Sequence, residues 1–448
     1  MKRNLTMRTF FVETWGCQMN QHDSELIEGQ LRRHGLEPAP SANGADLVVL
    51  NTCSVRDKPV QKIISRIGAL AKSSPRTTIG VCGCVAEQEG GALLDRSHSV
   101  GFVLGPGQAG RIGEAVRALT QGERPVFTGF DAETEHNHRT IFRKSSTRGM
   151  VTVIEGCNEF CTFCIVPYTR GREVSRPLDG ILDEVRRLAA DGVREVELLG
   201  QTINAYRCPR TGADLAGLLE RVAGVDGLLR VRFITSHPRH FDQGLIDVIA
   251  AKATVFSYLH LPIQSGSDPV LKRMHRRYTR GEYLDLVARI RAASPEINLS
   301  TDIIVGFPGE SEADFEATLA VLDEVRFGQV FAFGFSPRPR TPAARYRPRV
   351  PDEVVSERLQ RLFAMTDRIS LELNQELVGR RVQVLIDGPS RRDPSHWQGR
   401  GEDNRVVNFP ALGREGVGDL VEVEILRAGP HALAGEIVAG AVRLPVLP

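Results

Sequence analysis

The chain has 448 residues, of which 41% are hydrophobic and 25% charged, as is ordinary for globular proteins. This length exceeds what one hydrophobic core supports, so about two to four domains are expected. Lysine and arginine total 57 against 55 acidic residues, and a net charge of +2 excludes nucleic-acid binding through overall charge alone. No segment is apolar enough for a membrane span or a secretion signal, which predicts a cytoplasmic protein. Eight cysteines in such a chain indicate metal or redox chemistry rather than disulfides.

The first part of the chain alternates between short apolar strands and helices, as in an open parallel sheet. The pattern predicts strands at 10–12, 47–50 and 78–81 and helices around 24–31 and 63–67. Each strand is followed by a cysteine, namely Cys17, Cys53 and Cys84. Because the carboxyl ends of parallel strands meet at one edge of such a sheet, these residues are expected to form a three-thiolate site there.

The spacing leaves two alternatives open at this edge. The thiols could instead be buried structural residues, since cysteine is common in protein interiors. Cys82 also lies at the same strand end as Cys84, and strand geometry does not choose between the two. The choice therefore depends on the residues around each cysteine.

A helix and then a polar connection are expected over 108–147. The part over 131–148 is rich in Glu, His and Arg. His136 and His138 are possible metal ligands, but without thiols nearby they are interpreted as solvated linker residues. This connection marks the first domain boundary.

The strongest chemical signal is the CxxxCxxC spacing of Cys157, Cys161 and Cys164. A structural zinc ion takes four protein ligands, whereas a four-iron cluster on three cysteines keeps one iron free to bind a small molecule. The alternatives are a zinc loop completed by a distant histidine, or cysteines buried as small hydrophobic side chains. Three cysteines within eight residues favour the cluster.

With Phe163 before its last cysteine, this loop resembles the cluster loop of the radical S-adenosylmethionine (SAM) enzymes. The resemblance implies that Cys157, Cys161 and Cys164 are the cluster ligands and that Phe163 lies beside the SAM adenine. It also implies that the free iron binds SAM, and that the cluster's electron cleaves SAM to a 5′-deoxyadenosyl radical.

After Met150 a strand–helix rhythm persists for six units. The strands are predicted at 151–154, 196–199, 231–234, 258–261, 302–305 and 330–333. Repeated units with right-handed crossovers close into a barrel or open into a doubly wound sheet. Six units fall short of the eight of a full barrel, so a partial (β/α)6 barrel with functional loops at the carboxyl ends of its strands is expected. His237 lies in one such loop, where it fits a proton carrier or, at least equally well, a loop residue bonded to backbone, and it is assigned no role.

The last third of the chain changes character. Five arginines stand among prolines over 338–349, which fits either an extended phosphate-binding run or a solvated linker. A long helix is predicted over 352–377, with Val355, Leu359, Leu362, Met365 and Ile369 on one face. Strands at 381–386, 406–409, 420–425 and 434–438 then indicate a small β-barrel.

Basic and aromatic residues in this barrel suggest RNA binding. They are Arg391, Arg392, Arg400, Arg405, Trp397 and Phe409, which supply charge and stacking faces suited to looped or single-stranded RNA. A small barrel with surface arginines has no necessary RNA function. The run over 399–407, however, resembles the signature of the RNA-binding TRAM domain.

From Trp15 to about Gly440 the chain resembles the radical SAM methylthiotransferases. The phrases that carry this resemblance are Gly16-Cys17-Gln18-Met19-Asn20, Asn51-Thr52-Cys53-Ser54-Val55-Arg56-Asp57, Gly83-Cys84-Val85-Ala86 and Val166-Pro167-Tyr168-Thr169-Arg170-Gly171-Arg172-Glu173. That family places a second [4Fe-4S] cluster on the three N-terminal cysteines, which implies Cys17, Cys53 and Cys84 as ligands and leaves Cys82 as an extra thiol. Gly200 and Gln201 then fall where SAM binds through its amino group, and Gln264 and Ser265 line the SAM site.

The resemblance implies an α/β architecture of three domains. They are an N-terminal open sheet over 8–125, a radical SAM barrel over 143–374 and a TRAM barrel over 377–440. Three positions depart from the family pattern: Thr202 replaces Asn, Phe335 replaces Tyr and Arg340 replaces Gly. The last of these puts the conformation of its loop in question. Cys208 has no partner in the motifs and is interpreted as incidental.

The implied reaction is methylthiolation of N(6)-isopentenyladenosine next to the anticodon of tRNA, with two SAM molecules used per product. A low-potential electron donor such as flavodoxin or ferredoxin, the tRNA anticodon stem-loop and a monomeric state are expected. The alternatives are methylthiolation of an aspartate of a ribosomal protein, which shares both clusters and the terminal barrel, or a non-catalytic metal-bound RNA-binding protein. The phrases around Cys17 and Cys53 and the stretch over 166–173 favour tRNA.

Overall fold

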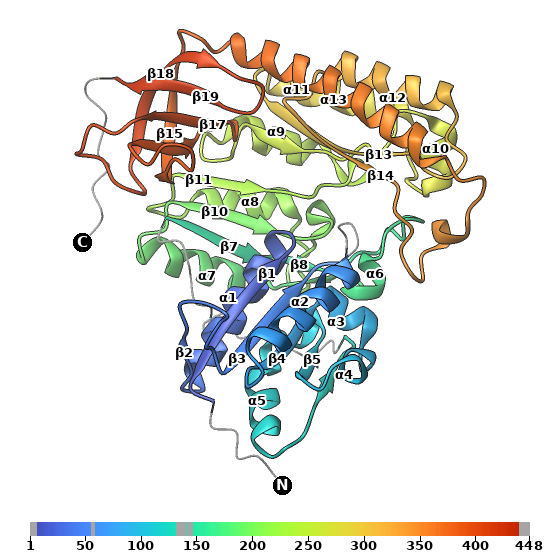
Figure 1. The fold of residues 1–448 in the computed structure, drawn as a ribbon. Coiled ribbons are helices and arrows are strands. Elements are labelled where there is room, and N and C mark those ends of the chain that lie inside the picture. Colours follow the sequence, from blue (N-terminus) through green and yellow to red (C-terminus); the bar gives the residue numbers. More distant parts are fainter. Residues whose placement is uncertain (1–6, 55–58, 131–140, 142–146, 439–448) are drawn as a thin grey trace.

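The computed structural model describes residues 7–54, 59–130, 141 and 147–438, which form three packed units along the chain (Figure 1). The N-terminal unit (blue) adjoins the central strands and helices (green to yellow), and the C-terminal strands (red) pack at the far side of the central unit. His136 and His138 lie outside the described residues. None of the helices in the described ranges combines the length and apolar character needed to span a membrane.

The N-terminal unit is an open sheet of parallel strands in the order β2-β1-β3-β4-β5-β6. The predicted strands are β1 (Thr9–Trp15), β3 (Leu47–Thr52) and β4 (Thr78–Gly83). The sequence pattern missed β2 (Glu37–Pro38) and β6 (Val126–Phe127), because two-residue strands carry little periodic signal, and it also missed the fully buried β5 (Val100–Leu104). The helices are α1 (Gln18–Arg33), α2 (Pro59–Ser73), α3 (Cys84–Glu89), α4 (Ala92–Arg96) and α5 (Ile112–Thr120), with a 3-10 turn η1 (Pro106–Arg111).

Helices cover both faces of this sheet. Leu26 and Ile27 of α1 belong to the core on one face, and Ile63 and Ile67 of α2 belong to the core on the other. Strands enclosed on both sides are apolar along their whole length, as the fully buried β3 is. Only the strand ends remain for polar groups and thiols.

The central unit contains the six predicted parallel strands, arranged as two sheets of three rather than a closed ring. They are β7 (Arg148–Thr152), β10 (Glu195–Leu199), β11 (Arg230–Phe233), β12 (Tyr258–His260), β13 (Asn298–Val305) and β14 (Gln329–Gly334). Its helices are α7 (Leu178–Ala190), α8 (Leu215–Ala223), α9 (Gln243–Ala251), α10 (Asp268–Met274), α11 (Arg280–Ala293) and α12 (Glu312–Val325). Shorter elements are β8 (Ile154–Glu155), α6 (Val166–Thr169), β9 (Val174–Ser175) and the 3-10 turns η3 (Ile203–Ala205), η4 (Pro238–His240) and η5 (Pro342–Arg345).

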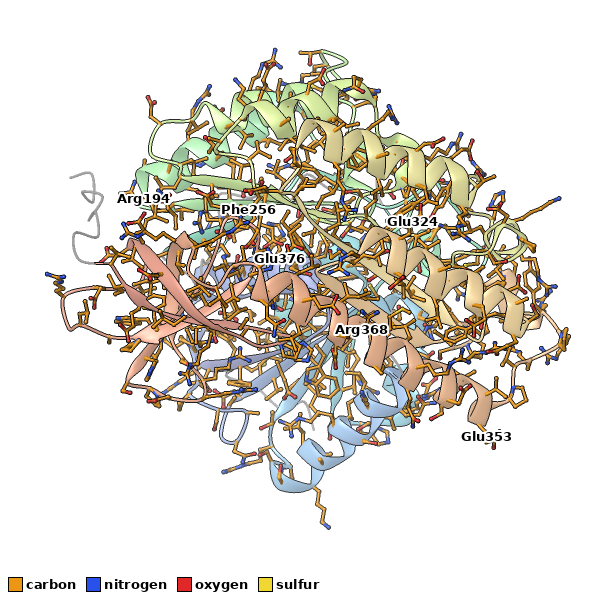
Figure 2. The ribbon with its side chains drawn as sticks, turned by 90° about the horizontal axis from the view of Figure 1, so that it is seen from above. Arg194, Phe256, Glu324, Glu353, Arg368 and Glu376 are labelled. Carbon is orange, nitrogen blue, oxygen red and sulfur yellow. The ribbon has the colours of Figure 1, made fainter. Side chains whose placement is uncertain are left out.

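The long helix α13 (Asp352–Gln375) connects the central unit to the terminal strands. Leu362 and Ile369 are buried on the predicted apolar face. Ion pairs fasten the helix to α12, with Arg358 2.9 Å from Glu312 and Arg368 3.3 Å from Asp323. Figure 2 shows Glu353, Arg368 and Glu376 spaced along α13, and Glu324 on the neighbouring α12.

The terminal unit is a closed five-stranded barrel in the order β15-β16-β17-β19-β18. Its strands are β15 (Arg381–Pro389), β16 (His396–Arg400), β17 (Val406–Pro410), β18 (Leu420–Ala428) and β19 (Leu433–Ile437). The sequence pattern missed β16, whose residues His-Trp-Gln-Gly-Arg do not alternate in polarity. β16 is a strand because β15 and β17 pair with its two edges, so tertiary context decides its structure.

Buried charges fasten this barrel to the first strands of the central unit. Arg232 of β11 donates to Glu197 Oε2 at 2.6 Å and to Asn404 Oδ1 at 3.0 Å. Its Nε lies 3.2 Å from Glu195 Oε1. The carboxylates of Glu195 and Glu197 are buried beneath the barrel, so the guanidinium of Arg232 compensates charge that water does not reach.

Replacing Arg232 by alanine is expected to lower the free energy of unfolding by about 3–5 kcal/mol, because buried Glu197 loses its ion-pair partner and buried Glu195 is left with Arg148, 3.0 Å away. Urea-induced unfolding measures the loss. The control is Arg186→Ala, which removes an exposed ion pair with Asp183 and should change stability by less than about 0.5 kcal/mol. Equal losses in the two variants would contradict this account of the interface.

Candidate functional site

The loop after β8 brings together Cys157, Cys161 and Cys164. The sulfur of Cys157 lies 3.2 Å from Thr202 Oγ1, and Arg276 Nη1 donates to the sulfur of Cys161 at 3.5 Å. Burial raises the pKa of Cys157 and raises that of Cys164 to about 12. The loop therefore presents three thiols in a low-dielectric environment. The buried guanidinium of Arg276 can balance negative charge on them.

Segments distant in sequence hold this loop in place. Thr162, between the second and third cysteines, donates its N–H to Met274 O at 3.0 Å and accepts from Ala343 N at 2.9 Å. Its hydroxyl donates to Arg273 O at 2.9 Å. The arginine-rich run over 338–349 therefore packs beside the thiol loop and is not a free linker.

The predicted SAM contacts lie around the same loop. Gln201, which with Gly200 follows β10, accepts a hydrogen bond from the backbone N–H of Gly156 directly before Cys157. Its side-chain Nε2 is buried and has no hydrogen-bond partner among the described residues. Phe163 is half-buried and packs against the cluster of Val270, Met274, Phe307 and Ala343.

Gln264 and Ser265 follow β12 and are both buried. Gln264 has a positive φ of 74° and continues the sheet by exchanging backbone hydrogen bonds with β13. The hydroxyl of Ser265 lies 3.4 Å from Thr318 Oγ1 on α12. This loop backbone is thus fixed by its neighbours, and the Ser265 side chain is occupied by a contact within the protein.

The second site lies at the carboxyl edge of the N-terminal sheet, where Cys17, Cys53 and Cys84 come together. A hydrogen bond from Cys53, with the nearby Arg170, lowers the pKa of Cys17 to about 5 against the opposing effect of burial. Burial raises the pKa of Cys84, which also feels the charges of Cys17 and Arg170. The predicted convergence of three strand ends therefore occurs.

Two glycines and two asparagines shape this edge. A Cβ on Gly16 would lie 2.7 Å from Cys53 Cβ, and one on Gly83 would lie 2.4 Å from Thr52 O. Asn20 accepts from the backbone N–H and the thiol of Cys17, each at 3.3 Å. Asn51 donates to Asn20 O at 2.8 Å. Each of the three cysteine phrases thus contributes a thiol together with a glycine that permits close approach or an asparagine that hydrogen-bonds to a neighbouring segment.

The structure separates Cys82 from Cys84. Cys82 is 1% exposed and belongs to the apolar core beneath α1, and burial raises its pKa far above the usual range. Cys84 instead begins α3 and lies beside Cys17. Cys208 is a buried thiol that accepts from the backbone N–H of Leu178, in line with its interpretation as incidental.

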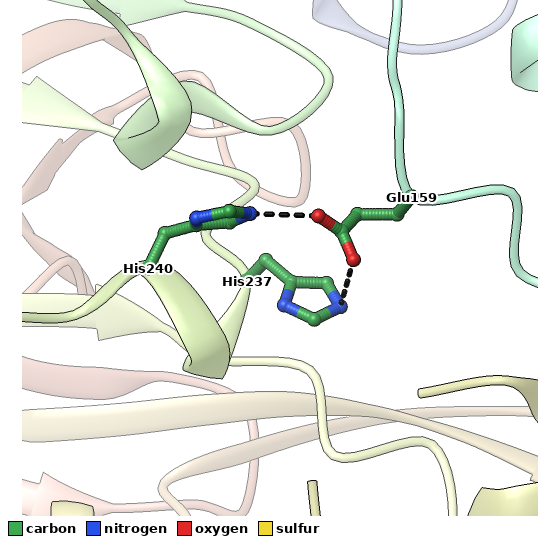
Figure 3. A group of neighbouring side chains, drawn as sticks. All are labelled: Glu159, His237 and His240. Carbon is green, nitrogen blue, oxygen red and sulfur yellow. Dashed lines mark hydrogen bonds and ion pairs between the residues drawn. The ribbon is translucent and has the colours of Figure 1, made fainter. Parts of the chain in front are cut away.

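A buried group that the sequence pattern did not reveal braces the first thiol loop. Glu159 lies between Cys157 and Cys161, and its Oε1 is 2.7 Å from His240 Nε2 while its Oε2 is 3.7 Å from His237 Nε2 (Figure 3). His237 Nδ1 accepts from the backbone N–H of Arg239 at 3.3 Å, as its interpretation as a backbone-bonded loop residue predicts.

The group of Glu159, His237 and His240 is better explained as a contact that holds the first thiol loop in place than as a metal site. Its ligand atoms all lie within 4.8 Å of one another, and it is the one such group among the described residues. Burial lowers the pKa of His237, and the charges of Arg276, Arg239 and Arg277 lower it further. The burial and the positive charges that disfavour a proton on His237 would also disfavour a bound metal cation at this position. Neither cysteine triad is as compact, which suits a multi-iron cluster better than a single ion.

The departures from the family pattern are accommodated. Arg340 has a φ of 68°, so it adopts the left-handed conformation that glycine takes more readily. Thr202 places its hydroxyl against the sulfur of Cys157. Phe335 packs edge-on against Phe307 at 5.3 Å between ring centroids.

The barrel arginines fall into two groups. Arg400 donates to Asn404 O at 3.1 Å, and Arg405 Nε donates to Asn374 Oδ1 of α13 at 2.7 Å. These two guanidiniums are therefore engaged within the chain and differ from the expectation that they face RNA. Arg391 and Arg392 are exposed.

Three families match successive parts of the chain. They are "Uncharacterized protein family UPF0004" over residues 9–105, the Radical SAM superfamily over 151–322 and the TRAM domain over 375–438. A curated tRNA-2-methylthio-N(6)-dimethylallyladenosine synthase from Burkholderia thailandensis is 44% identical over 441 residues, covering 96% of each chain. One of the same name from Erythrobacter litoralis is 43% identical over 448 residues, covering 98% of this chain and 99% of the other.

Solved structures share the fold at lower identity. The radical S-adenosylmethionine methyltransferase TsrM from Kitasatospora setae, with cobalamin and a [4Fe-4S] cluster bound, has a TM-score of 0.54 and 17% identity, covering 76% of this chain and 77% of that one. The cobalamin-dependent SAM radical enzyme OxsB has a TM-score of 0.53 and 12% identity, covering 81% of this chain and 56% of that one. At these identities the likeness concerns the fold alone.

Gly83→Ala tests whether the close strand approach at the second thiol site matters. The control is Gly122→Ala, which has a similar φ of +83° but nothing within 4 Å of the added Cβ. Gly122→Ala meets no close atom, whereas Gly83, with φ 88° and ψ −159°, lies in a region that essentially only glycine adopts and its added methyl would overlap Thr52, so Gly83→Ala should cost about 1–3 kcal/mol more. Urea-induced unfolding compares the two variants, and equal losses would show that the contact is not constrained.

Proposed function

The chain belongs to the tRNA-2-methylthio-N(6)-dimethylallyladenosine synthase family, and we propose on that basis that it methylthiolates N(6)-isopentenyladenosine next to the anticodon of tRNA in a radical SAM-dependent reaction. The observation that most supports this proposal is the pair of separate three-thiol sites, on two adjoining domains, in one chain with an RNA-binding type of barrel. One three-thiol site would suffice to hold the cluster that radical SAM chemistry needs. The second gives the chain a place for the sulfur.

The residues of the first site fit a [4Fe-4S] cluster. Cys157, Cys161 and Cys164 offer three thiolates from one loop, and Arg276 offers a buried N–H to the sulfur of Cys161. When bound, the cluster supplies the coordination site and the electron for reductive cleavage of SAM. Gln201 would orient SAM through its unpartnered Nε2, and Gly200, Phe163, Gln264 and Ser265 would shape the surrounding wall.

The residues of the second site also fit a sulfur-rich cluster. Cys17, Cys53 and Cys84 form a set of three thiols, of which Cys53 and Cys84 are buried, and thiolate ligands favour soft metal chemistry. We assign a second [4Fe-4S] cluster to them, which when bound supplies the transferred sulfur. Cys84 is preferred over Cys82, because Cys82 lies in the apolar core.

The proposed partners follow from the same surfaces. Arg273, Arg345 and Arg347 are exposed beside the first thiol loop, where they would contact the phosphates of an anticodon stem-loop. A low-potential donor such as flavodoxin or ferredoxin would deliver electrons to a monomeric enzyme. Eight free cysteines suit a reducing compartment, so we propose the cytoplasm as the location. The domain bounds 8–125, 143–374 and 377–440 are part of the proposal.

A ribosomal-protein substrate is not favoured. The relatives that match the whole chain at 43–44% identity carry the tRNA name, and both chains are covered nearly end to end. A non-catalytic RNA-binding protein would have no use for two separate sets of three thiols.

Mass spectrometry of tRNA nucleosides tests the function in a strain of the source organism that lacks the gene. The strain should lose 2-methylthio-isopentenyladenosine and accumulate the isopentenyl form, because the methylthio group has no other source. Wild-type protein and Cys82→Ala should restore the product, whereas Cys53→Ala and Cys84→Ala should not. An unchanged nucleoside profile on deletion would refute the proposed substrate.

The purified variants separate the two sites. Cys157→Ala should abolish reductive SAM cleavage, whereas Cys53→Ala should retain cleavage without methylthio transfer. Methylthio product from Cys53→Ala would refute the second site. Loss of the product in Cys82→Ala with retention in Cys84→Ala would reverse our choice between these two cysteines.

The arginines beside the first thiol loop are tested by the salt dependence of tRNA binding. Arg345→Ala with Arg347→Ala should weaken binding and reduce the slope of log K against log salt by about 1 for each arginine, because each phosphate contact releases counterions. Arg186→Ala with Arg221→Ala removes the same charge from the exposed surfaces of α7 and α8 and should leave the slope unchanged. An unchanged slope in the first pair would exclude these phosphate contacts.

A further inference from the structure

Arg170 belongs to the central unit but lies inside the second thiol site. It directly follows the short helix α6, and its Nη2 donates to Asp23 Oδ2 of α1 at 2.5 Å. Its side chain is 4% exposed, and the two residues are 147 positions apart in the chain. In sequence, Arg170 follows Cys164, the last cysteine of the first thiol loop, by six residues. In space, however, it lies at the second thiol site.

Two geometric relations place Arg170 at the second thiol site. Its partner Asp23 lies on α1, which begins directly after Cys17, and α6, which directly precedes Arg170, packs against α3, which begins at Cys84. The Nη1 of Arg170 is buried and has no hydrogen-bond partner among the described residues. An unsatisfied donor on a buried cation costs more than one on a neutral group, so its presence calls for a reason.

A contact that only joined the central unit to the N-terminal unit would not explain this arrangement. Asp23 accounts for Nη2 only, whereas an arginine selected for pairing alone would use both nitrogens in a bidentate contact. The two domains are also joined nearby without charge, where His22 Nδ1 lies 3.3 Å from Thr152 Oγ1. The unused N–H and the nearby thiols together indicate an anionic sulfur group as its intended acceptor.

We propose that Arg170 is a positioning residue for the metal–sulfur group at Cys17, Cys53 and Cys84, with Nη1 donating a hydrogen bond to a sulfur of that group while Nη2 stays on Asp23. The inference rests on the second cluster of the proposed function. A cation that donates to cluster sulfur stabilises the reduced, more negative state and so raises the reduction potential. Asp23, as the counter-charge, offsets part of this effect.

The test measures the second cluster by itself in the full-length chain. Cys157→Ala, Cys161→Ala and Cys164→Ala are combined as the parent, and Arg170→Gln, Arg170→Lys and Asp23→Asn are added singly. Arg172→Gln is the matched control, since Arg172 is exposed and stacks on the Phe160 ring at 4.3 Å. Iron and sulfide per chain are determined, and the midpoint potential is followed by electron paramagnetic resonance during a redox titration.

The expected shifts have opposite signs. Arg170→Gln should move the midpoint to a more negative value, Asp23→Asn should move it to a more positive value, and Arg170→Lys should lie between the parent and Arg170→Gln. Arg172→Gln should match the parent. A purely structural contact would not produce opposite shifts from the two members of one ion pair.

Three results would overturn the inference. A parent with iron and sulfide but with the same midpoint in Arg170→Gln and Asp23→Asn would refute the role of Arg170 and leave the proposed function intact. If Arg170→Gln cannot be loaded with iron, unchanged midpoints in Arg170→Lys and Asp23→Asn refute it equally. A parent that holds no iron at all refutes the second cluster itself, and the inference falls with it.

Discussion

The structure depends on the shared carboxyl edge of parallel strands. Strands enclosed by helices on both faces leave only their ends for polar groups, so chemistry collects there. In the N-terminal sheet, β1, β3 and β4 are neighbours, and each is followed by or ends beside one thiol of the second site. The central unit repeats the principle after the parallel strands β7 and β10, with the short β8 standing between β7 and the thiol loop. Two sites of similar chemistry therefore arise from one rule of topology.

Much of the fold and of the candidate site could be predicted because the signals are local. A cysteine directly after an apolar run marks a strand end, and three cysteines within one loop mark a cluster, whatever the rest of the chain does. The six central strands and the long α13 were likewise predicted from periodicity. The preference for Cys84 over Cys82 came only from family phrases, and the place of Cys82 in the apolar core beneath α1 supports it.

The contacts that the sequence did not reveal are non-local. Glu159 and His240 are 81 residues apart, and Arg170 and Asp23 are 147 apart, so no spacing rule connects either pair. β16 escaped prediction because its residues become a strand only through pairing with both neighbours. Arg400 and Arg405 looked like RNA contacts by composition, but composition does not say which way a side chain faces.

The inward use of those two arginines has a consequence for selection of the modified base. Arg232 and Arg148 of the central unit donate to Asn404 and Asp387 of the barrel, and Arg405 of the barrel donates to Asn374 of α13, so these contacts hold the barrel against the rest of the chain. An RNA bound on its outer face would thus reach the reaction centre over a constant span. The barrel would then select the nucleotide by its distance along the RNA from the point of attachment, rather than by the identity of the bases that the barrel contacts.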